Sequence, residues 1–462
     1  MIGTRKLGGC RRPITAGQPG NPKYSSRRCK VYSSSALSAA DSRLASDGLI
    51  FSSGPSGSWD EAGVGSPVVR CFVGDNEERW YMWYSGRRKG APAMDLIAPS
   101  SGSLGVAISR DGLQWHRSSE AVEGERHGVA AKLDVGAMLT PNQDWWTFDT
   151  AHLSVGDVQV LGNSAVNQGV GVYWCFYSGG NFEEIAIPDS MPGASSLIQA
   201  QASNSPGSPA VVEGLRTRPG LAMSQDGRNW ARIEGDHYTG ALFDVGEEGE
   251  WDELFIGHPQ VLEMGPRERR MYYHSWDKRR SRFVVGMASS ADGFIWKKKG
   301  VVYDPVEQGA QPNAHDGLGA SSRQVVRDLD NRQFLMFYEA VAADGTKSIG
   351  LAASKDGISW KRCPHPVLQS ASSSNGTNSP SNIREAGSSQ EHSTGAWDGG
   401  EVGAPCPVSM SKGQWRLYYG GRAQRGTPGP LNGIGLALSD KNGPVFEGVP
   451  ASYTRRKAAP II

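Results

Sequence analysis

One pattern of residues occurs five times along this chain of 462 residues, and it constrains the fold more than any other feature. The pattern is an apolar segment with a central glycine, followed in four copies by Ser-x-Asp-Gly and a tryptophan. The copies are SLGVAISRDGLQW from Ser103, RPGLAMSQDGRNW from Arg218, VVGMASSADGFIW from Val284, SIGLAASKDGISW from Ser348 and the incomplete GIGLALSD from Gly433. A unit that recurs in this way predicts a repeat architecture.

The Asp-Gly step of the pattern predicts the turn of a β-hairpin. In type I′ turns both central residues have positive φ, and Asp-Gly is a favoured pair for these positions. The preceding serine can hydrogen-bond to the turn backbone. The tryptophan comes early in the next strand, where we expect it to cover the gap to a neighbouring sheet.

Two further units precede each copy, and together they predict a complete blade. The first is an aromatic strand, in the segments Trp80–Ser85, Tyr173–Ser178, Met271–Ser275, Phe334–Glu339 and Trp415–Gly420. The second is a loop with an aspartate before an apolar strand, as in WDELFIGHPQVL from Trp251. Four short strands per unit and five units predict an all-β fold, a five-bladed β-propeller with four-stranded antiparallel blades, over residues 46–462.

Two insertions interrupt the propeller pattern, at about 185–215 and 366–395. Both contain low-complexity sequence rich in Ser, Gly, Pro or Ala, as in QSASSSNGTNSPSN from Gln369. Such composition is typical of disordered loops, because it offers little apolar surface to bury.

The N-terminal segment, residues 1–45, differs from the rest of the chain. Its first 40 residues hold eight basic residues, many serines and no acid. This composition predicts a transit peptide for import into an organelle, the chloroplast rather than the mitochondrion, or alternatively a disordered basic tail. Without these eight residues, the 48 basic residues fall to 40 against 47 acidic ones, so the body is mildly acidic and nucleic acid is not the expected partner.

Several other classes of protein are not indicated by the sequence. No apolar run approaches the roughly 18 residues that a membrane span needs, so no membrane partner is expected. The six cysteines are widely spaced and contain no C-x-x-C pair, so we predict neither a metal site nor a cofactor. The oligomeric state cannot be read from these features.

The three units together resemble the five-bladed propellers of the arabinanase–levansucrase–invertase superfamily of glycosidases, over about residues 50 to 450. This resemblance implies hydrolysis by a pair of carboxylic acids in a central funnel. It also implies Asp, Asp and Glu on the inner strands of the first three blades. The chain departs from that pattern, with Ser66-Pro67 in blade one and Gly257-His258-Pro259 in blade three. Only blade two offers an inner-strand acid, Asp157.

Repetition helps to separate structural residues from functional ones. One aspartate recurs in all five blades, at positions Asp60, Asp149, Asp252, Asp316 and Asp398. A residue needed in every blade is expected to hold a turn or to bond between blades, although one member of the set could serve catalysis. Polar residues found in one blade only are better candidates, because a charge within an apolar strand is costly unless it is paired or functional.

On this basis we predict two groups of site residues. The catalytic candidates are Asp157, Asp149, Asp60, Glu253 and Glu339. The candidates for substrate contact are His258, Arg323, Asp252, Asp316, Glu401 and Trp146. His258 could bind or protonate a sugar, or bond to the adjacent blade. Arg323 could hold a carboxylate or phosphate, or pair with the repeated aspartates.

The sequence therefore predicts a carbohydrate-active propeller with a carbohydrate ligand in its central funnel. The enzymatic hypothesis is a glycoside hydrolase, with glycosyl transfer or phosphorolysis as variants. The alternative is a non-catalytic propeller that binds glycan or protein, and the missing inner-strand acids favour it.

Overall fold

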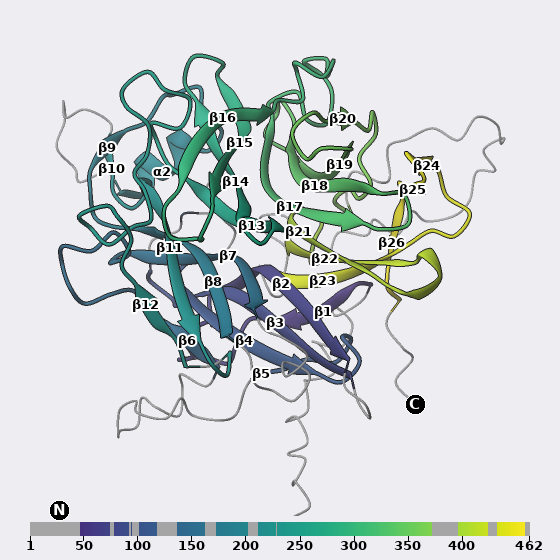
Figure 1. The fold of residues 1–462 in the computed structure, drawn as a ribbon, viewed down its shortest axis with the longest axis horizontal. Coiled ribbons are helices and arrows are strands. Elements are labelled where there is room, and N and C mark those ends of the chain that lie inside the picture. The colour runs from purple at the N-terminus through teal and green to yellow at the C-terminus, as the bar shows by residue number, and fades with distance from the viewer. Residues whose placement is uncertain are drawn as a thin grey trace, which may run out of the picture.

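The structure is a computed structural model. It describes residues 47–73, 78–91, 94, 101–117, 136–161, 172–201, 211–227, 229–371, 396–423 and 432–457. Five antiparallel sheets stand around a common centre, and the chain visits them in sequence order (Figure 1). The first strand of each sheet lies innermost, next to the first strands of the two neighbouring sheets. The predicted five-bladed β-propeller is thus confirmed.

Each of the first four blades is built from one continuous stretch of the chain, although β9 and β10 interrupt blade 2. Blade 1 holds β2 (Gly63–Val73), β3 (Glu78–Arg87), β4 (Ser103–Ser109) and β5 (His116–Arg117), with β6 (Ala137–Leu139) also paired to β4. Blade 2 holds β7 (His152–Leu161), β8 (Val172–Gly180), β11 (Thr217–Ser224) and β12 (Ala231–Ile233). Blade 3 holds β13 (Gly257–Gly265), β14 (Glu268–Asp277), β15 (Arg282–Ser290) and β16 (Lys297–Tyr303). Blade 4 holds β17 (Ala320–Asp328), β18 (Gln333–Val341), β19 (Lys347–Ser354) and β20 (Lys361–Arg362).

Blade 5 joins the two ends of the described chain. Its inner three strands are β21 (Glu401–Ser409), β22 (Trp415–Arg422) and β23 (Asn432–Ser439). Its outer positions are filled by β1 (Leu49–Ser52) and β26 (Tyr453–Arg455), which both pair antiparallel with β23. Gly48 also donates a backbone hydrogen bond to Arg456 at 2.7 Å. The ring is therefore closed by a strand from each end of the chain.

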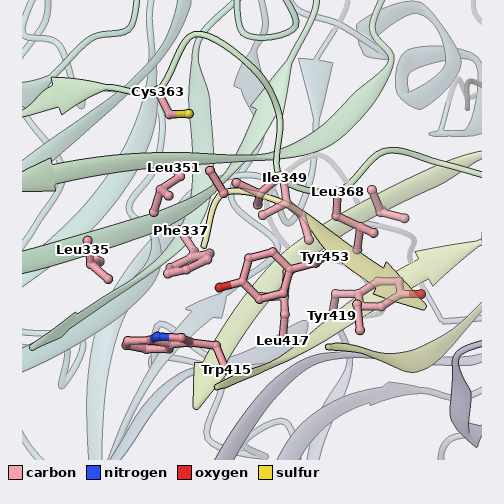
Figure 2. Close-up of a cluster of buried hydrophobic side chains, with 14 of the residues drawn as sticks. Leu335, Phe337, Ile349, Leu351, Cys363, Leu368, Trp415, Leu417, Tyr419 and Tyr453 are labelled. Carbon is pink, nitrogen blue, oxygen red and sulfur yellow. The ribbon is translucent and has the colours of Figure 1, made fainter. Parts of the chain in front are cut away.

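The apolar core lies between neighbouring blades. The cluster between blades 4 and 5 contains Phe337 from β18, Trp415 from β22 and Tyr453 from β26 (Figure 2). Phe337 packs edge-on against Tyr453, with ring centroids 5.9 Å apart. The closing strand β26 is thus bound by side-chain packing as well as by backbone pairing.

One buried unit of three side chains recurs in every blade. The repeated aspartate accepts a hydrogen bond from a tyrosine of the second strand. It also forms an ion pair with a cation of the outermost strand. In blade 1, Asp60 bonds to Tyr84 at 3.0 Å and to Arg117 at 2.8 Å. The corresponding sets are Asp149–Tyr177–Arg232, Asp252–Tyr273–Lys298, Asp316–Tyr338–Arg362 and Asp398–Tyr419–Arg455. This unit ties the loop before each blade to the second and outermost strands.

In blades 1, 3 and 5 the repeated glycine of the third strand is explained by the tryptophan that precedes the aspartate. In blade 3, the Trp251 ring stacks on Tyr273 and lies against Gly286. A Cβ atom at Gly286 would come within 2.1 Å of the indole. Only glycine leaves room for the ring at this position.

The Asp-Gly turns differ from the predicted type I′ geometry. In the copy at Ser109, only Gly112 has positive φ, at +69°. Asp111 instead accepts hydrogen bonds from the backbone N–H groups of Leu113 and Gln114. Ser109 accepts from the Gly112 N–H, as predicted for the serine. The aspartate carboxylate thus satisfies the turn backbone, and φ stays negative at that residue.

The tryptophan after each turn packs onto the preceding blade, as predicted. Trp115 of blade 1 lies edge-on to Tyr418 of blade 5, and Trp296 of blade 3 lies edge-on to Phe176 of blade 2. The turn itself docks there too, because Tyr418 donates a hydrogen bond to the Gly112 carbonyl at 2.9 Å. The repeat motif therefore fixes the contact between one blade and the next.

The first insertion, predicted to be a disordered loop, contains regular elements in its described part. It contains β9 (Ile185–Ala186), the helix α2 (Ala194–Gln201) and β10 (Val211–Val212), which pairs with β9. These elements belong to an apolar cluster that also includes Trp276 and Phe283 of blade 3. Of the second insertion, residues 366–371 are described, and residues 372–395 lie outside the described part. Residues 1–45 also lie outside it.

The remaining short elements lie between the strands of blade 5. A 3-10 turn occupies Ser411–Gly413, and β24 (Val445–Phe446) pairs with β25 (Val449–Pro450). Within the described residues, no helix has the length and apolar character required to cross a bilayer.

We predict that Gly286→Ala lowers the free energy of unfolding by about 3 kcal/mol, because the new methyl group overlaps the Trp251 ring. The measurement is the thermal unfolding midpoint of the full chain. Gly265→Ala in the same blade is the matched control, because a Cβ there has no neighbour within 4 Å. Equal midpoints for the two variants would contradict this account of the repeated glycine.

Candidate functional site

A second repeated position, the residue that follows the tyrosine of the buried unit, links blades 1, 2 and 4 to the next blade. Ser85 of blade 1 accepts a hydrogen bond from the Val155 N–H of blade 2. Ser178 of blade 2 accepts in the same way from the His258 N–H of blade 3. In blade 4 this position is Glu339, whose Oε2 accepts from the Ala404 N–H of blade 5 at 3.2 Å. One oxygen of Glu339 thus accepts the interblade hydrogen bond that a serine accepts in blades 1 and 2.

The other oxygen of Glu339 is what distinguishes blade 4. Oε1 accepts a hydrogen bond from Ser321 at 2.9 Å and forms an ion pair with Lys347, also at 2.9 Å. Lys347 begins β19 and also lies 3.9 Å from Glu401, at the start of β21. Arg422 lies 3.9 Å from Glu401 on the other side. Two predicted residues, Glu339 and Glu401, therefore share the cation Lys347, and Glu401 also lies near Arg422. Neither cation was predicted.

These four charged residues line a hollow between blades 4 and 5, which we call the blade 4–5 hollow. Val64, Gly403 and Asn432 are among its other lining residues. Glu339 and Lys347 form its buried floor, whereas Glu401 and Arg422 are 37% and 33% exposed. The free space in it holds about one water molecule. A sugar ring could therefore reach the exposed groups at its mouth but not enter its floor.

Lys347 holds the two carboxylates at a short separation. Burial lowers the pKa of Lys347, but Glu339 and Glu401 raise it by more, and the result lies above the ordinary value for lysine. The ammonium group therefore stays charged at neutral pH. Because both carboxylates approach the same ammonium, their nearest oxygens lie within about 7 Å of each other, which overlaps the separations used in glycoside hydrolysis.

The repeated aspartates lie outside this hollow. Asp60, Asp149, Asp252 and Asp316 are each buried in the three-residue unit of their own blade. Glu253 accepts a hydrogen bond from the Gly249 N–H at 2.9 Å and pairs with Lys278 at 3.4 Å. Glu61 of blade 1 makes the same loop contact, with the Gly57 N–H. These shared contacts are those that a structural role predicts.

Asp157 lies on the inner strand of blade 2, as predicted, and joins three blades. It forms an ion pair with Arg70 of blade 1 and accepts a hydrogen bond from the Val261 N–H of blade 3 at 3.3 Å. Burial raises the pKa of Asp157, with Arg70 acting in the opposite direction. The carboxylate is only 1% exposed, so a substrate would have to displace these contacts to reach it.

The central channel is filled with side chains at the level of Asp157. Gln324 of blade 4 crosses to blade 2, where its amide donates to the Gly156 carbonyl at 3.1 Å. Gln260 of blade 3 exchanges hydrogen bonds with the backbone of Val325 in blade 4. The funnel is therefore closed at this depth by buried amides.

Arg323 and His258 are both buried at the contact of blades 3 and 4. Arg323 donates to the carbonyls of Gly257, His258 and Tyr272 and contacts His274 Nδ1 at 3.1 Å. Burial lowers the pKa of Arg323 to about 9, with Asp157 opposing it. Burial, with Arg323, lowers the pKa of His258 well below its ordinary value, so that imidazole is neutral. Arg323 therefore bonds to backbone carbonyls of blade 3 rather than to the repeated aspartates, and His258 bonds to blade 2 through its backbone N–H.

Trp146 lies away from these groups, in the loop before β7, and is 41% exposed. The residues that the sequence prediction missed are Lys347, Arg422, Asn432 and His274. Lys347 occupies a position that is Gly102, Thr217, Phe283 and Asn432 in the other blades, so its lone charge was a usable signal. His274, not Ser275, is the blade 3 counterpart of Glu339, because it directly follows the tyrosine of the buried unit. In the described residues no cluster of His, Cys, Asp and Glu suits a metal ion.

Comparison with solved structures identifies the fold. A thermostable family-43 glycoside hydrolase matches with a TM-score of 0.51 and 12% identity, over 87% of this chain and 95% of that one. A protein from a structure described as a complex of BT0996 and RGII matches with a TM-score of 0.50 and 13% identity, over 89% and 97%. The fold is the five-bladed propeller of such glycoside hydrolases. This confirms the predicted resemblance in fold.

Sequence comparison adds no closer relationship. No family profile matches the chain, and no curated protein sequence matches it. At 12–13% identity the structural matches establish the architecture and nothing about the chemistry of this site.

We predict that Lys347→Met lowers the free energy of unfolding by about 3 kcal/mol at pH 7, because Glu339 keeps a buried charge without its cation. The folded pKa of Lys347 is above the unfolded one, so its contribution is complete below the ordinary lysine pKa and is lost as pH rises through the folded value. The difference from wild type should therefore be constant from pH 7 to 9 and shrink above that range.

The measurement is the unfolding midpoint of both proteins from pH 7 to 9 and at pH values above that range. The control is Lys355→Met, which removes an exposed lysine from the same blade. A Lys347→Met protein as stable as this control at pH 7 would show that the pair with Glu339 contributes nothing.

Proposed function

We propose that this chain is a glycan-binding propeller that recognises a sugar at the mouth of the blade 4–5 hollow. The observation that supports this most is the convergence of three kinds of polar group there: the Glu401 carboxylate, the Arg422 guanidinium and the Asn432 amide. Arg422 donates to Asn432 at 3.2 Å, which orients the amide. Carboxylate, guanidinium and amide groups together match the donors and acceptors of sugar hydroxyls.

The filled centre of the ring supports binding over catalysis. Gln324 closes the channel, and Asp157 is buried in an ion pair. Glu339 is 3% exposed, and both of its oxygens already accept hydrogen bonds from the protein. A general acid or base must reach the glycosidic oxygen or the attacking water, and these groups are enclosed.

Glycoside hydrolysis is the second candidate function. It is favoured by the two carboxylates of Glu339 and Glu401, which lie within about 7 Å because both approach Lys347. In that reaction Glu401, the more exposed of the two, would contact the substrate. Phosphorolysis with Arg323 holding phosphate is not supported, because that guanidinium is buried against backbone carbonyls.

The test is binding and turnover of a panel of oligosaccharides by the full chain and by Glu401→Gln. If the hollow binds glycan, we expect affinity to fall about tenfold, because a hydrogen bond to a charged group is lost. Glu307→Gln is the matched control, since Glu307 is 54% exposed and also pairs with an arginine. Its affinity should stay within about twofold of wild type.

Each result separates the two candidates. Unchanged binding with lost sugar release in Glu401→Gln would replace the binding proposal with hydrolysis. Failure of the wild-type chain to bind any glycan of the panel would overturn both.

We also propose that residues 1–45 direct the chain to an organelle, with the chloroplast favoured. The basic, acid-free composition supports this. A fluorescent fusion to residues 1–45 that stays in the cytosol would overturn it.

A further inference from the structure

A group of exposed aromatic side chains lies on blade 2, outside the blade 4–5 hollow. Among the described residues, five large aromatic side chains are strongly exposed, and four of these belong to the segments around blade 2. Trp145 is 88% exposed, Tyr238 83%, Phe182 56% and Trp146 41%. We call these four residues the blade 2 rim. Exposed apolar surface of this kind marks interaction sites when it is gathered in one region.

Three of these aromatic residues stand at the corners of tight turns. The Thr147 N–H donates to the Asp144 carbonyl at 3.0 Å, which places Trp145 and Trp146 at the two central positions. The Gly240 N–H donates to the His237 carbonyl at 2.8 Å, which places Tyr238 in the same way. These turns fix the backbone at the three residues and present their side chains to solvent.

The two turns are directly joined. The Phe148 N–H donates to the Thr239 carbonyl at 3.3 Å, one residue from Tyr238 and two from Trp146. Thr239 also bonds to His237 at 2.7 Å. The tryptophan turn and the tyrosine turn are therefore neighbours in the structure.

A network of ion pairs connects this surface to Phe182. Arg218 bonds to Asp244 at 2.6 Å and to Glu183 at 3.2 Å, and Asp244 lies 3.2 Å from His237. Glu183 directly follows Phe182, and His237 directly precedes Tyr238. The network thus connects the segment of Phe182 to that of Tyr238. Arg216 is a second cation that pairs with Glu183, at 2.9 Å.

In this network the carboxylates of Asp244 and Glu183 are more exposed to solvent than the guanidinium of Arg218. Arg218 is 4% exposed, whereas Asp244 and Glu183 are 43% and 36% exposed. Burial lowers the pKa of His237, with Asp244 opposing it, so this ring is neutral at pH 7. Further acids flank the rim, namely Asp144, Glu184 and Asp236. A ligand at the rim therefore meets aromatic faces and hydrogen-bond acceptors in an acidic field.

We propose that the blade 2 rim is a binding site for a neutral oligosaccharide. The C–H faces of sugar rings pack on Trp145, Trp146 and Tyr238, and their hydroxyl groups donate to Asp244 and Glu183. The acidic field excludes uronic acids, sulfated glycans and nucleic acid by repulsion. The alternation of aromatic and charged side chains suits an amphipathic ring better than the apolar face of a protein partner.

This inference shares only its class of ligand with the proposed function, because its residues lie on blade 2 and those of the hollow on blades 4 and 5. The two sites are therefore tested by different variants. Glu401→Gln affects the hollow alone, and variants of the rim leave Glu401 intact.

The experiment is calorimetric titration of the full chain with neutral hexasaccharides of arabinan, β-1,4-glucan and β-1,4-galactan. A polygalacturonate hexamer is the anionic comparison. We expect at least one neutral hexasaccharide to bind, and its affinity to fall by about tenfold or more in the double variant Trp145→Ala, Trp146→Ala. Tyr238→Ala should weaken binding in the same direction. Glu401→Gln should leave this binding event unchanged.

Phe294→Ala is the matched control, because Phe294 is the fifth exposed aromatic residue and lies on blade 3. Its affinity should stay within about twofold of wild type. Because all these side chains are on the surface, equal unfolding midpoints will show that the variants fold.

Four results would overturn the proposal. They are the absence of binding to every neutral hexasaccharide, unchanged affinity in the double tryptophan variant, and equal or stronger binding of polygalacturonate. The fourth is self-association of the wild-type chain that disappears in the double variant, because the rim would then contact a second copy.

Discussion

The propeller depends on a buried charge that is neutralised in the same way five times. In each blade an aspartate with little or no exposure bonds to a tyrosine of the second strand and a cation of the outermost strand. Burying a carboxylate costs several kcal/mol unless a cation and hydrogen bonds surround it. The unit therefore forms only when the loop, the second strand and the outermost strand are all in place. Its formation thus requires a correctly assembled blade. In blades 1, 3 and 5 the tryptophan beside it packs on a glycine, and a larger residue at that position would overlap the ring.

The candidate site arises from a change at one repeated position. Where blades 1 and 2 use serine to hold the inner strand of the next blade, blade 4 uses Glu339. A carboxylate can fill the structural role with one oxygen and keep the other for Lys347. Glu401 then lies close to the same cation. The family resemblance implies acids on the inner strands of blades one to three, so this arrangement lies on a different side of the ring.

Much of the architecture was predictable because repetition exposes it. The strand order and the blade count follow from five copies of three units, and the structural reading of Asp60 and its equivalents follows from their presence in all blades. The site was predictable only in part. Glu339 and Glu401 stood out as charges in apolar strands, and the same comparison of blades could have found their partner Lys347, whose position is uncharged in the other four. Pairings such as Gln324 across the channel depend on how strands from distant blades face each other, and no local pattern encodes that.

The closure of blade 5 has a consequence for how this chain reaches its native state. Strand β1 near residue 50 pairs with β23 near residue 434, and Gly48 bonds to Arg456, so these contacts join residues separated by almost the whole described chain. Contacts of such long sequence separation make folding slow. During synthesis, blades 1 to 4 can form as they emerge, but β1 has no partner until β23 is made. An unpaired strand and an open sheet edge are then exposed together until β23 emerges, and exposed edges of this kind favour aggregation during folding.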